Sequence, residues 1–338
     1  MLEIDGSHGE GGGQILRTSI ALSSVLNEPV KIIKIRANRP TAGLAPSHVT
    51  SIEAVAQISD AEVDGLFQGS KEIMFKPGQL VGGDYEFDVG TAGSISLVIQ
   101  SCLLPAILSK SRTRLTVTGG TDVRWSPPID FMRLVHLPML QRFGPTFDIE
   151  TSGRGFYPEG GGKVRVEIFP ASRLSPAVLD SQGKVQSIEG IAYAQNLPEH
   201  VVSRMKHAAL KRLLDFKEVR IDSDLGKGHS TGAGIVASAR CANTVLGASA
   251  LGAKGVKSEV LGEDCAADLL ETIGSGATVD EHMLDQILPY MALAGAGSIV
   301  LAEGLSNHAR TNIWVIERFL GRKFDVTQKD DLTEIRTV

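Results

Sequence analysis

A supersecondary pattern that recurs along the chain constrains its fold more than any other feature of the sequence. A glycine turn, an apolar helix and a strand that ends near arginines occur over residues 5–39 and again over residues 89–124. The two copies are spaced by about 85 residues, as in an internal duplication. A third copy lies at residues 280–326. We therefore expect an α/β (α+β) protein built of three βαβαββ units.

Hydrophobic periodicity and capping residues predict the elements of these units. In the first unit, Ser47 is expected to cap the second helix, and the strand at residues 85–89 is expected to be the last strand. Helices are predicted over residues 15–26, 48–58, 95–108, 127–143, 280–292 and 311–320, and strands over residues 29–36, 72–75, 85–89, 112–118, 146–151, 163–169, 298–302 and 323–326.

The pattern changes between the second and third units, which indicates a small inserted α/β domain. Strands are predicted there at residues 185–193, 217–222 and 234–241, and helices at residues 199–216 and 265–273. The predicted boundaries give a repeat-built domain of residues 1–183 and 277–338 and an inserted domain of residues 184–276. The polar stretch of residues 171–182 is predicted to be a linker.

Composition narrows the class of protein. With 338 residues, the chain is long enough for two or more domains. Its net charge is −5, so binding of RNA or DNA requires a local basic patch. The three cysteines, Cys102, Cys241 and Cys265, lie far apart, which favours a reducing compartment over a zinc site or a disulfide framework. No signal-peptide pattern or bilayer-spanning apolar run is present, so a cytoplasmic location without a membrane partner is expected.

A glycine-rich loop leads into the first helix. Residues 5–17 contain five glycines together with Glu10, Gln14 and Arg17. Such a loop can bind anions, because its N–H groups are free and the helix dipole favours negative charge. The alternative is a tight turn that needs glycine only for its backbone dihedral angles. The loop is neither a P-loop nor a dinucleotide fingerprint, but its carboxylate and guanidinium favour metal and phosphate binding.

Four arginines are expected to gather at one rim of the repeat fold. Arg17, Arg36, Arg39 and Arg124 lie at strand ends or helix starts beside glycine loops, and as a set they suit phosphate recognition. The alternative for each one alone is an ordinary surface arginine. Glu10 is a candidate ligand for Mg²⁺ or Mn²⁺. Since no cluster of Asp, Glu and His marks a full cage, a metal bridged by substrate phosphates is expected.

His308 is the one histidine of eight that is a candidate nucleophile. It lies after a predicted strand and just before a predicted helix, where open α/β folds place reactive groups. A neutral imidazole is a competent nucleophile. The alternative is a loop histidine that is merely solvated.

Seven motifs lie in collinear order along the chain. They are Asp5-Gly-x-x-Gly-Glu-Gly-Gly-Gly-Gln-Ile-Leu-Arg17, Ile35-Arg-x-x-Arg39, Gly82-Gly-Asp-Tyr85, Gly119-Gly-Thr-Asp122, Gly155-Phe-Tyr-Pro-x-Gly-Gly-Gly162, Met291-Ala-Leu-Ala-Gly-Ala-Gly297 and His308-x-x-Thr-Asn312. Together they resemble the motifs of the RNA 3′-terminal phosphate cyclases over nearly the whole chain. That family's fold resembles three βαβαββ units, like the C-terminal domain of a translation initiation factor, plus one inserted small α/β domain.

The resemblance implies an ATP-dependent ligase reaction in three steps. His308 would attack the α-phosphorus of ATP through Nε2, releasing pyrophosphate and forming a covalent histidine–AMP. AMP would then pass to the 3′-phosphate of RNA. The neighbouring 2′-hydroxyl would attack the activated phosphate, giving a 2′,3′-cyclic phosphate and AMP. The implied partners are ATP and RNA 3′-phosphate ends. Formation of a homo-oligomer is compatible with the resemblance but not implied by it.

The resemblance also implies roles for single residues around the catalytic His308. Glu10 would help to hold the metal and phosphates, with Gln14, Arg17, Arg36 and Arg39 close to phosphate. The nucleotide pocket would be lined by Gln100, Glu281, His282, Met283, Leu284, Asp285 and Gln286, with Asp285 as the polar anchor.

Two positions depart from the family pattern. Ser47 stands where family members can carry a larger polar residue. The segment 247–251 offers no aromatic ring as an adenine platform, so no residue of the inserted domain is assigned to nucleotide binding.

Two other functions are alternatives. One is a non-catalytic family relative that acts in ribosomal RNA processing, but such relatives lack the nucleophilic histidine. The other is an enolpyruvyl transferase, whose architecture uses related βαβαββ repeats. That class would predict more repeats, a longer chain and no nucleophilic histidine.

Overall fold

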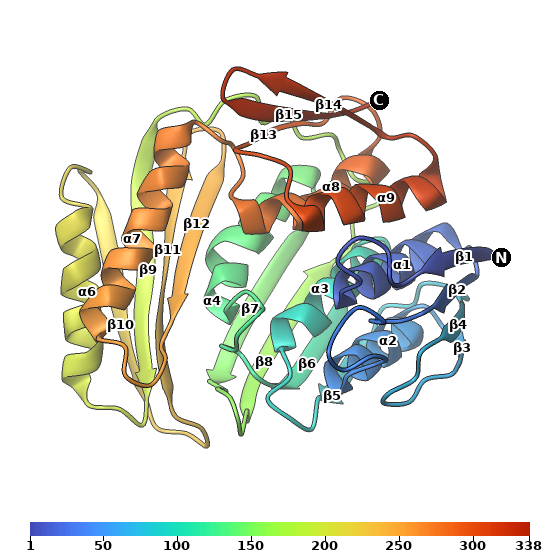
Figure 1. Cartoon of the computed structure of the whole chain (residues 1–338), viewed down its shortest axis with the longest axis horizontal. Helices are drawn as coiled ribbons and strands as arrows, with labels where there is room; N and C mark the ends of the chain where they lie inside the picture. The colour runs from blue at the N-terminus through green and yellow to red at the C-terminus, as the bar shows by residue number, and fades with distance from the viewer.

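The computed structural model describes all 338 residues and contains one βαβαββ unit at the N-terminus (Figure 1). Its strands form a sheet in the order β1-β2-β4-β3, in which β1 and β2 are parallel and the other neighbours are antiparallel. The elements of this unit are β1 (Leu2–Asp5), α1 (Gly13–Leu26), β2 (Val30–Ile33), α2 (Pro46–Ile58), β3 (Glu62–Asp64) and β4 (Ile73–Lys76).

The second unit repeats this topology, with its sheet in the order β5-β6-β8-β7. Its second helix is a continuous helical segment that changes pitch through a π-helical turn, η1. The elements are β5 (Asp84–Asp88), α3 (Ile95–Ile107), β6 (Thr113–Gly119), α4 (Ile129–Phe131), η1 (Met132–His136), α5 (Leu137–Leu140), η2 (Gln141–Phe143), β7 (Thr146–Gly153) and β8 (Gly162–Phe169).

The third unit has a three-stranded sheet, β13-β15-β14, and a short first strand that lies far away in sequence. Val178 forms a parallel bridge with Ile299, so residues 177–179 occupy the place that β1 and β5 hold in the other units. The remaining elements are α8 (Glu281–Ala294), β13 (Ile299–Ala302), α9 (Asn307–Leu320), β14 (Phe324–Lys329) and β15 (Leu332–Thr337).

The inserted segment follows this short strand in the sequence and forms its own sheet, β10-β9-β11-β12, at one end of the molecule (Figure 1). Its helices α6 and α7 pack against each other and against that sheet. The elements are β9 (Val185–Gln195), α6 (Glu199–Arg212), β10 (Val219–Gly226), β11 (Gly232–Cys241), β12 (Val245–Leu251) and α7 (Ser258–Ser275).

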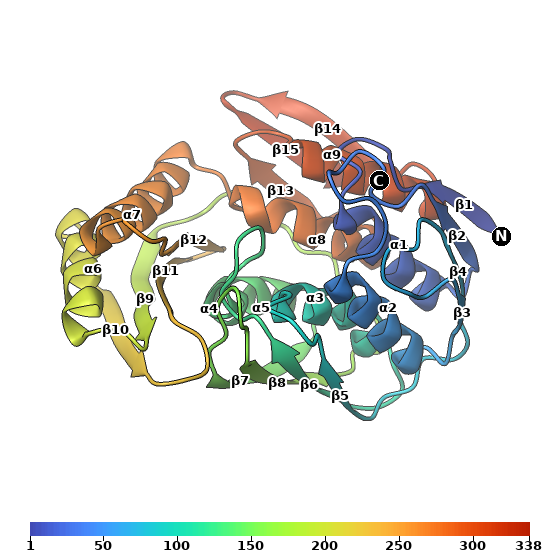
Figure 2. The ribbon, with the colours of Figure 1, turned by 60° about the horizontal axis from the view of Figure 1, so that its bottom comes forward.

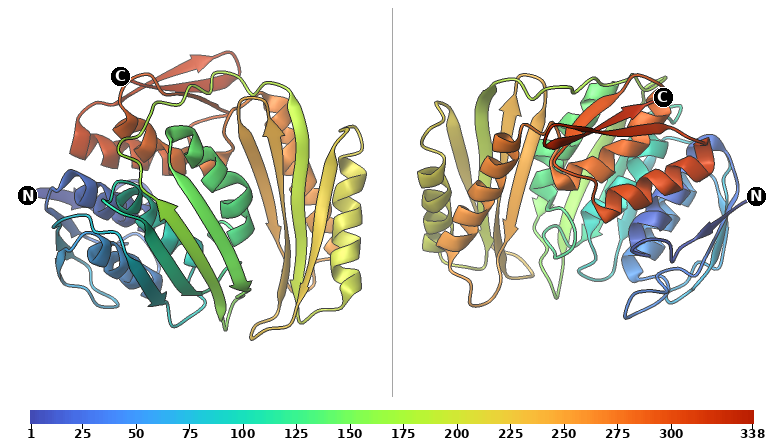
Figure 3. Two further views of the ribbon diagram at one scale, coloured as in Figure 1. Left: turned by 180° about the vertical axis from the view of Figure 1, so that it is seen from behind. Right: turned by 45° about the horizontal axis from the view of Figure 1, so that its top comes forward.

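The predicted α/β fold of three repeated units with an inserted α/β domain is therefore confirmed. In the repeat-built part, the sheets lie on the outside and cover the helices, which meet in the interior (Figure 3). The main hydrophobic core contains 62 residues. A second core of 19 residues draws only on the stretch from Ile188 to Leu269. The exact domain boundaries stay a prediction.

Several sequence-based expectations for individual elements are wrong. The strand at residues 85–89 opens the second unit, because β3, which was not predicted, supplies the third strand of the first unit. Ser47 does not cap α2: the helix starts after Ala45, whose N–H donates to Nδ1 of His48. Residues 171–182 are not a free linker, since Ala177 and Leu179 are buried and hydrogen-bond to Ile299.

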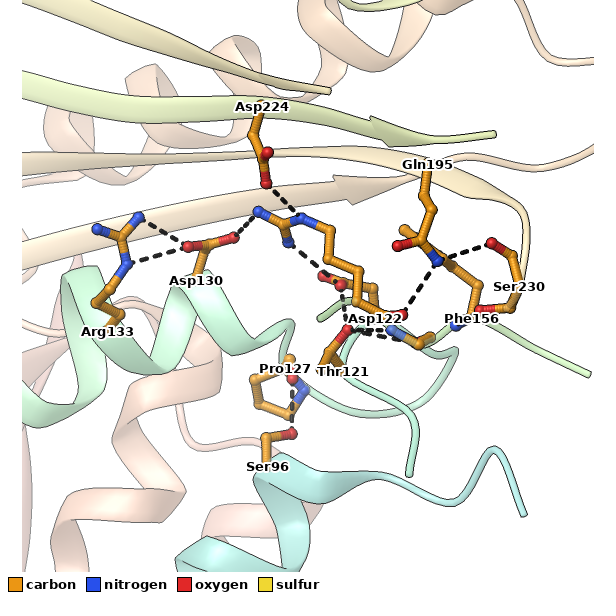
Figure 4. A network of polar contacts seen from close by, with 12 residues as sticks. Ser96, Thr121, Asp122, Pro127, Asp130, Arg133, Phe156, Gln195, Asp224 and Ser230 are labelled. Carbon is orange, nitrogen blue, oxygen red and sulfur yellow. Dashed lines mark hydrogen bonds and ion pairs between the residues drawn. The ribbon is translucent and has the colours of Figure 1, made fainter. Parts of the chain in front are cut away.

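A buried charge network joins the insertion to the second unit (Figure 4). The Arg154 guanidinium pairs with Asp122 (3.3 Å) and Asp130 (2.7 Å) of the second unit and with Asp224 (2.8 Å) of the insertion. It also lies 3.8 Å from the ring centroid of Tyr193 in β9. Burial disfavours the charge of Arg154, but the aspartates outweigh this effect and raise its pKa. The network fixes the insertion against the repeats.

None of the helices combines the length and apolar character needed to cross a lipid bilayer.

Candidate active site

The candidate active site forms where the N-termini of α1 and α9 meet α8 in the repeat-built part of the fold (Figure 2). Gln14, at the start of α1, links the other two helices. Its Nε2 donates to Oδ2 of Asp285 on α8 over 2.6 Å, and its Oε1 lies 2.8 Å from Nδ1 of His308 on α9. Residues from the first and third units thus meet across 294 positions of sequence.

This arrangement sets the tautomer of His308. Because the amide nitrogen of Gln14 donates to a carboxylate, its oxygen faces the imidazole and requires a proton on Nδ1. Nε2 is then the nitrogen that carries the lone pair of the neutral ring. It points to Oε2 of Glu10, 3.1 Å away, in the glycine loop. Because a carboxylate oxygen only accepts, this contact requires a proton on Nε2, and the lone pair becomes available once Glu10 moves away. The side chain is 51% exposed, so Nε2 can be reached by a ligand.

His308 lies in the first turn of α9, not in a loop before the helix as the sequence suggested. Ser306 caps this helix by accepting from the N–H of Ala309. The position of His308 on a capped helix makes it more rigid than a loop residue. It also places the imidazole beside the positive end of the helix dipole, where negative charge is favoured.

The glycines of the first loop are required by close packing. A Cβ on Gly9 would lie 2.4 Å from Oγ1 of Thr311, and the residue has a φ of +55°. A Cβ on Gly13 would lie 2.2 Å from Nε2 of His48. The loop therefore runs directly over the starts of α9 and α2. This close approach brings Glu10 to His308.

Asp285 is a buried carboxylate, as its proposed role of polar anchor suggested. Burial raises its pKa to about 7, and the charge of Arg17 opposes this effect. Burial likewise lowers the pKa of Arg17 to about 10, opposed by Asp285. Nε2 of Gln286 donates to the same Asp285 oxygen over 2.8 Å.

A set of hydrogen bonds behind His308, which was not predicted from the sequence, joins the three helices of the site. Thr18 donates through Oγ1 to Oδ1 of Asn312 over 2.7 Å, and Nδ2 of Asn312 donates to the backbone carbonyl of Asp285. These contacts tie α1, α9 and α8 together behind His308. Asn312 belongs to the conspicuous His308-x-x-Thr-Asn312 motif, which is the signal that could have identified it.

Arg36 and Arg39 lie on the loop after β2, near the glycine loop. Nη2 of Arg39 is 3.3 Å from Oε2 of Glu10. Arg36 has a φ of +54° and donates to the carbonyl of Gly43 over 3.1 Å, but it has no carboxylate partner. Burial, with a smaller contribution from Arg39, lowers the pKa of Arg36. An unpaired guanidinium of this kind is available to an anion.

His48 is a further residue that the sequence interpretation did not assign. It is buried beside Gly13 and Arg17. Burial, together with the charges of Arg17 and Arg36, lowers its pKa to about 3. The ring is therefore neutral at physiological pH and adds no charge to the arginines around it.

Gln100 reaches the site from α3 of the second unit. Neither its amide oxygen nor its amide nitrogen has a hydrogen-bond partner, although both are buried. Together with Gln14, Arg17 and Asp285 it lines a small cavity of about 40 Å³. Orphaned polar atoms facing a cavity are typical of a site that a ligand or water completes.

The side chains of residues 281–286 face different surroundings: two pairs line two separate cavities, and one pair lies in the hydrophobic core. Asp285 and Gln286 line the small cavity. Glu281 and His282 line a second cavity of about 620 Å³, between β12, α7 and the start of α9. Met283 and Leu284 have side chains buried in the hydrophobic core. Of the predicted residues, the structure brings Glu10, Gln14, Arg39, Asp285 and His308 into one connected network.

The fit of a divalent metal ion rests on Glu10 alone. The chain has no group of three or more His, Cys, Asp or Glu side chains placed to hold a metal. Oε2 of Glu10 faces both His308 and Arg39, while no hydrogen bond or ion pair involves its Oε1. Such a donor set suits an ion that takes its other ligands from water and phosphate.

Comparisons with known proteins identify the family of this chain. A family model described as "RNA 3'-terminal phosphate cyclase" matches residues 8–326. A protein of that name from Nitrosospira multiformis is 43% identical, with 99% of this chain and 96% of the relative covered. Another from Methanopyrus kandleri is 43% identical over 98% of this chain and 96% of its own. One from Methanosarcina barkeri is 43% identical over 99% of both chains. The chain therefore belongs to the RNA 3′-terminal phosphate cyclase family.

Proposed function

We propose that this enzyme converts an RNA 3′-phosphate end into a 2′,3′-cyclic phosphate at the expense of ATP, with His308 as the nucleophile. Membership of the cyclase family supports the overall reaction. The observation that carries the proposed mechanism is the Asp285–Gln14–His308 chain of hydrogen bonds. It keeps a proton on Nδ1 of His308, so the exposed Nε2 is the nitrogen that can attack once Glu10 has moved away. The same chain argues against a non-catalytic relative.

In the first step, Nε2 of His308 forms a bond to the α-phosphorus of ATP, and the bond to the bridging oxygen of pyrophosphate breaks. Gln14 holds the proton on Nδ1 and stabilises the charge that develops on the ring. The dipole of α9 favours the negative charge that builds up on the phosphoryl oxygens.

The two sides of His308 suit different parts of ATP. The cavity of about 620 Å³ is lined by five carboxylates, Asp268, Glu271, Asp280, Glu281 and Glu303. These charges repel a triphosphate but accept the neutral nucleoside, for which His282 offers an aromatic face. The glycine loop and the guanidinium groups of Arg36 and Arg39 lie by Glu10 and suit the phosphates.

Glu10 would hold Mg²⁺ or Mn²⁺ through its carboxylate, and a bound divalent ion would neutralise charge on the phosphates. Glu10 would then turn from Nε2 of His308 to the ion. That change frees the lone pair of Nε2 for the phosphorus.

In the second and third steps, AMP passes from His308 to the RNA 3′-phosphate, and the 2′-hydroxyl then displaces AMP. A phosphate monoester is a poor electrophile, and adenylylation gives it a good leaving group. The 2′-hydroxyl is already close to the activated phosphorus, so proximity lowers much of the remaining barrier. Only a ribonucleotide end carries this hydroxyl.

The test is covalent labelling with ATP that carries a label in its α-phosphate, in the presence of a divalent metal. Wild type should retain label that is acid-labile and base-stable, as expected for a phosphoramidate, and His308→Ala should retain none. His8→Ala is a matched control, because His8 lies in the same glycine loop but stacks on Trp314 at 3.9 Å. Label on folded His308→Ala would refute the assignment, and no label on folded wild type would refute the mechanism.

A further inference from the structure

A continuous rim of loops leads away from the candidate active site along the second unit. We use "rim" for residues 9–13, 45–48, 90–94, 119–127 and 155–161. Segments of the rim follow β1, β5 and β6. The parallel pairing of β5 with β6 places the ends of these two strands on one edge of the second sheet.

Contacts between neighbouring segments make the rim continuous. Gly13 touches His48 at the start of α2, as described above. The adjacent Ser47 has its Cβ only 3.1 Å from the position that a Cβ of Gly93 would take. The carbonyl of Gly93 accepts from the N–H of Gly120 over 2.8 Å.

The last two segments of the rim are joined by backbone pairing. Asp122 forms a parallel bridge with Phe156, and the N–H groups of Thr121 and Asp122 both donate to the carbonyl of Gly155. Figure 4 shows Asp122 and Phe156 next to each other, below the strands of the insertion. The ion pairs of Arg154 with Asp122 and Asp224 hold this junction in place.

Two exposed aromatic side chains project from this end of the rim. Trp125 is 96% exposed and Tyr157 is 78% exposed. Trp125 also has a φ of +68°, a strained conformation for a bulky residue. Its loop is anchored on both sides of it, because Ser126 donates to Val123 and Ser96 donates to the carbonyl of Pro127. The loop thus holds a large apolar ring in water at a cost in conformational energy.

One exposed cation in the rim and two close to it complement a phosphodiester backbone. Arg124, next to Trp125, is exposed and has no ion pair or hydrogen bond. Arg36, near the other end, has no carboxylate partner, as noted above. Lys227 is a further exposed, unpaired cation, two residues from His229, which packs on Gly161. Glu159 is the one acidic residue between Arg154 and Gly162.

We propose that the rim binds the single-stranded segment of RNA directly upstream of its 3′-phosphate, an inference that rests on the proposed function. Bases stack on Trp125 and Tyr157, and Arg124 neutralises a phosphate between them and the terminal nucleotide. Base–aromatic stacking tolerates any sequence and requires unpaired bases, whereas paired bases hide their faces. The rim therefore selects flexible ends without reading their sequence.

The test compares two substrates that both end in a 3′-phosphate, a dinucleotide and a ten-nucleotide oligouridine. Trp125→Ala should raise the KM for the ten-mer about 10-fold, the expected loss for one stacked base, and leave the KM for the dinucleotide unchanged. Self-adenylylation by ATP should also be unchanged. Trp125→Phe, which retains a ring, should restore most of the affinity. Leu214→Ala is a matched control, because Leu214 is 76% exposed but lies on the insertion, before β10.

A binding measurement without turnover separates the two proposals. A ten-nucleotide oligouridine with a 3′-hydroxyl should quench the fluorescence of wild type without ATP, and it should not quench Trp125→Phe, which retains only Trp314. Equal KM values of Trp125→Ala and Leu214→Ala for the ten-mer would overturn the rim as an RNA site. An equal loss on both substrates would also overturn it, because Trp125 would then act at the terminal nucleotide. Failure of self-adenylylation in wild type would instead refute the proposed function.

Discussion

Oε1 of Gln14 accepts a hydrogen bond from Nδ1 of His308 over 2.8 Å and so joins the first helix of the chain to the last. Gln14 can serve as acceptor only because its other amide atom is committed to Asp285. The imidazole of His308 is therefore oriented by a neutral amide whose own orientation is set by a buried carboxylate. His308, as the proposed nucleophile, would be held as in other covalent catalysts, in which one side chain orients the reacting group and a further side chain orients the first.

Gln14→Ala should slow self-adenylylation about 10- to 100-fold, because the imidazole loses the acceptor that sets its tautomer. The rate is measured by single-turnover labelling with α-labelled ATP. The KM for ATP should change little, since the loss concerns the attacking atom.

Gln14→Glu should not rescue this rate. It restores an acceptor for His308 but replaces the donor to Asp285 with a second carboxylate at 2.6 Å. Wild-type labelling by either variant would show that Gln14 does not orient His308.

Asp285→Asn should change how stability depends on pH. The folded protein retains a proton on Asp285 up to a pKa of about 7, whereas the unfolded chain releases it near 3.8. The folded state therefore binds more protons between these values, and the stability contributed by Asp285 falls as the pH rises through this window. Asp285→Asn removes this contribution.

The measurement is the free energy of unfolding of both proteins between pH 4 and 8. The difference, wild type minus Asp285→Asn, should decrease with rising pH. Taking the difference cancels the opposite trend from His48 and His136, whose pKa values are lowered to about 3 and about 4 by burial. A difference that does not vary with pH would contradict the raised pKa of Asp285.

Arg39→Ala should slow cyclisation by about 10-fold or more and slow self-adenylylation less, if its guanidinium serves the RNA phosphate. The two rates are measured separately, as protein labelling and as conversion of a pre-formed RNA-adenylate. Arg36→Ala is the comparison, because Arg36 lies on the same loop but does not pair with Glu10. Equal losses in both rates for Arg39→Ala would place it on the ATP side.

Arg154→Met should destabilise the fold by about 3–5 kcal/mol, because it leaves Asp122 buried without a cation and removes the more buried of the two guanidinium groups at Asp130. Arg133→Met removes a guanidinium from the same Asp130 at 2.7 Å, but the Arg133 side chain is 42% exposed. That variant should lose less than about 1 kcal/mol. Urea unfolding measures both, and similar losses would show that the network is not a structural junction.

The repeated fold could be predicted from sequence because its helices are amphipathic or apolar and its glycine turns recur. Three strands were missed, β3, β12 and β15, and the first two have a physical reason. β3 is short and mostly exposed, so it has no apolar pattern. β12, with the sequence Val-Leu-Gly-Ala-Ser-Ala-Leu, is rich in small residues of low strand propensity. Residues 171–182 were wrongly predicted to be a linker, because residues 177–179 pair only with the distant β13 and nothing in the neighbouring sequence indicates this pairing.

The candidate site could be predicted in its residue types but not in its connections. Glu10, Gln14 and His308 were found because their motifs are dense in polar residues. The hydrogen bond from Thr18 to Asn312 could not be predicted, since its partners are separated by 294 positions and the sequence around Thr18 is that of an ordinary helix. Whether these residues act as proposed stays a prediction.

The split third unit has a consequence for synthesis on the ribosome. Ala177 is made before the insertion, yet its N–H donates to Oγ of Ser298, 121 residues later. The first two units can fold as they emerge, but the third closes only after the insertion has been completed. Gln14 and Glu10 are made long before His308, with which they pair. A polypeptide released before α9 therefore has the arginines and the glycine loop but lacks the proposed nucleophile, and by the proposed mechanism it would not consume ATP.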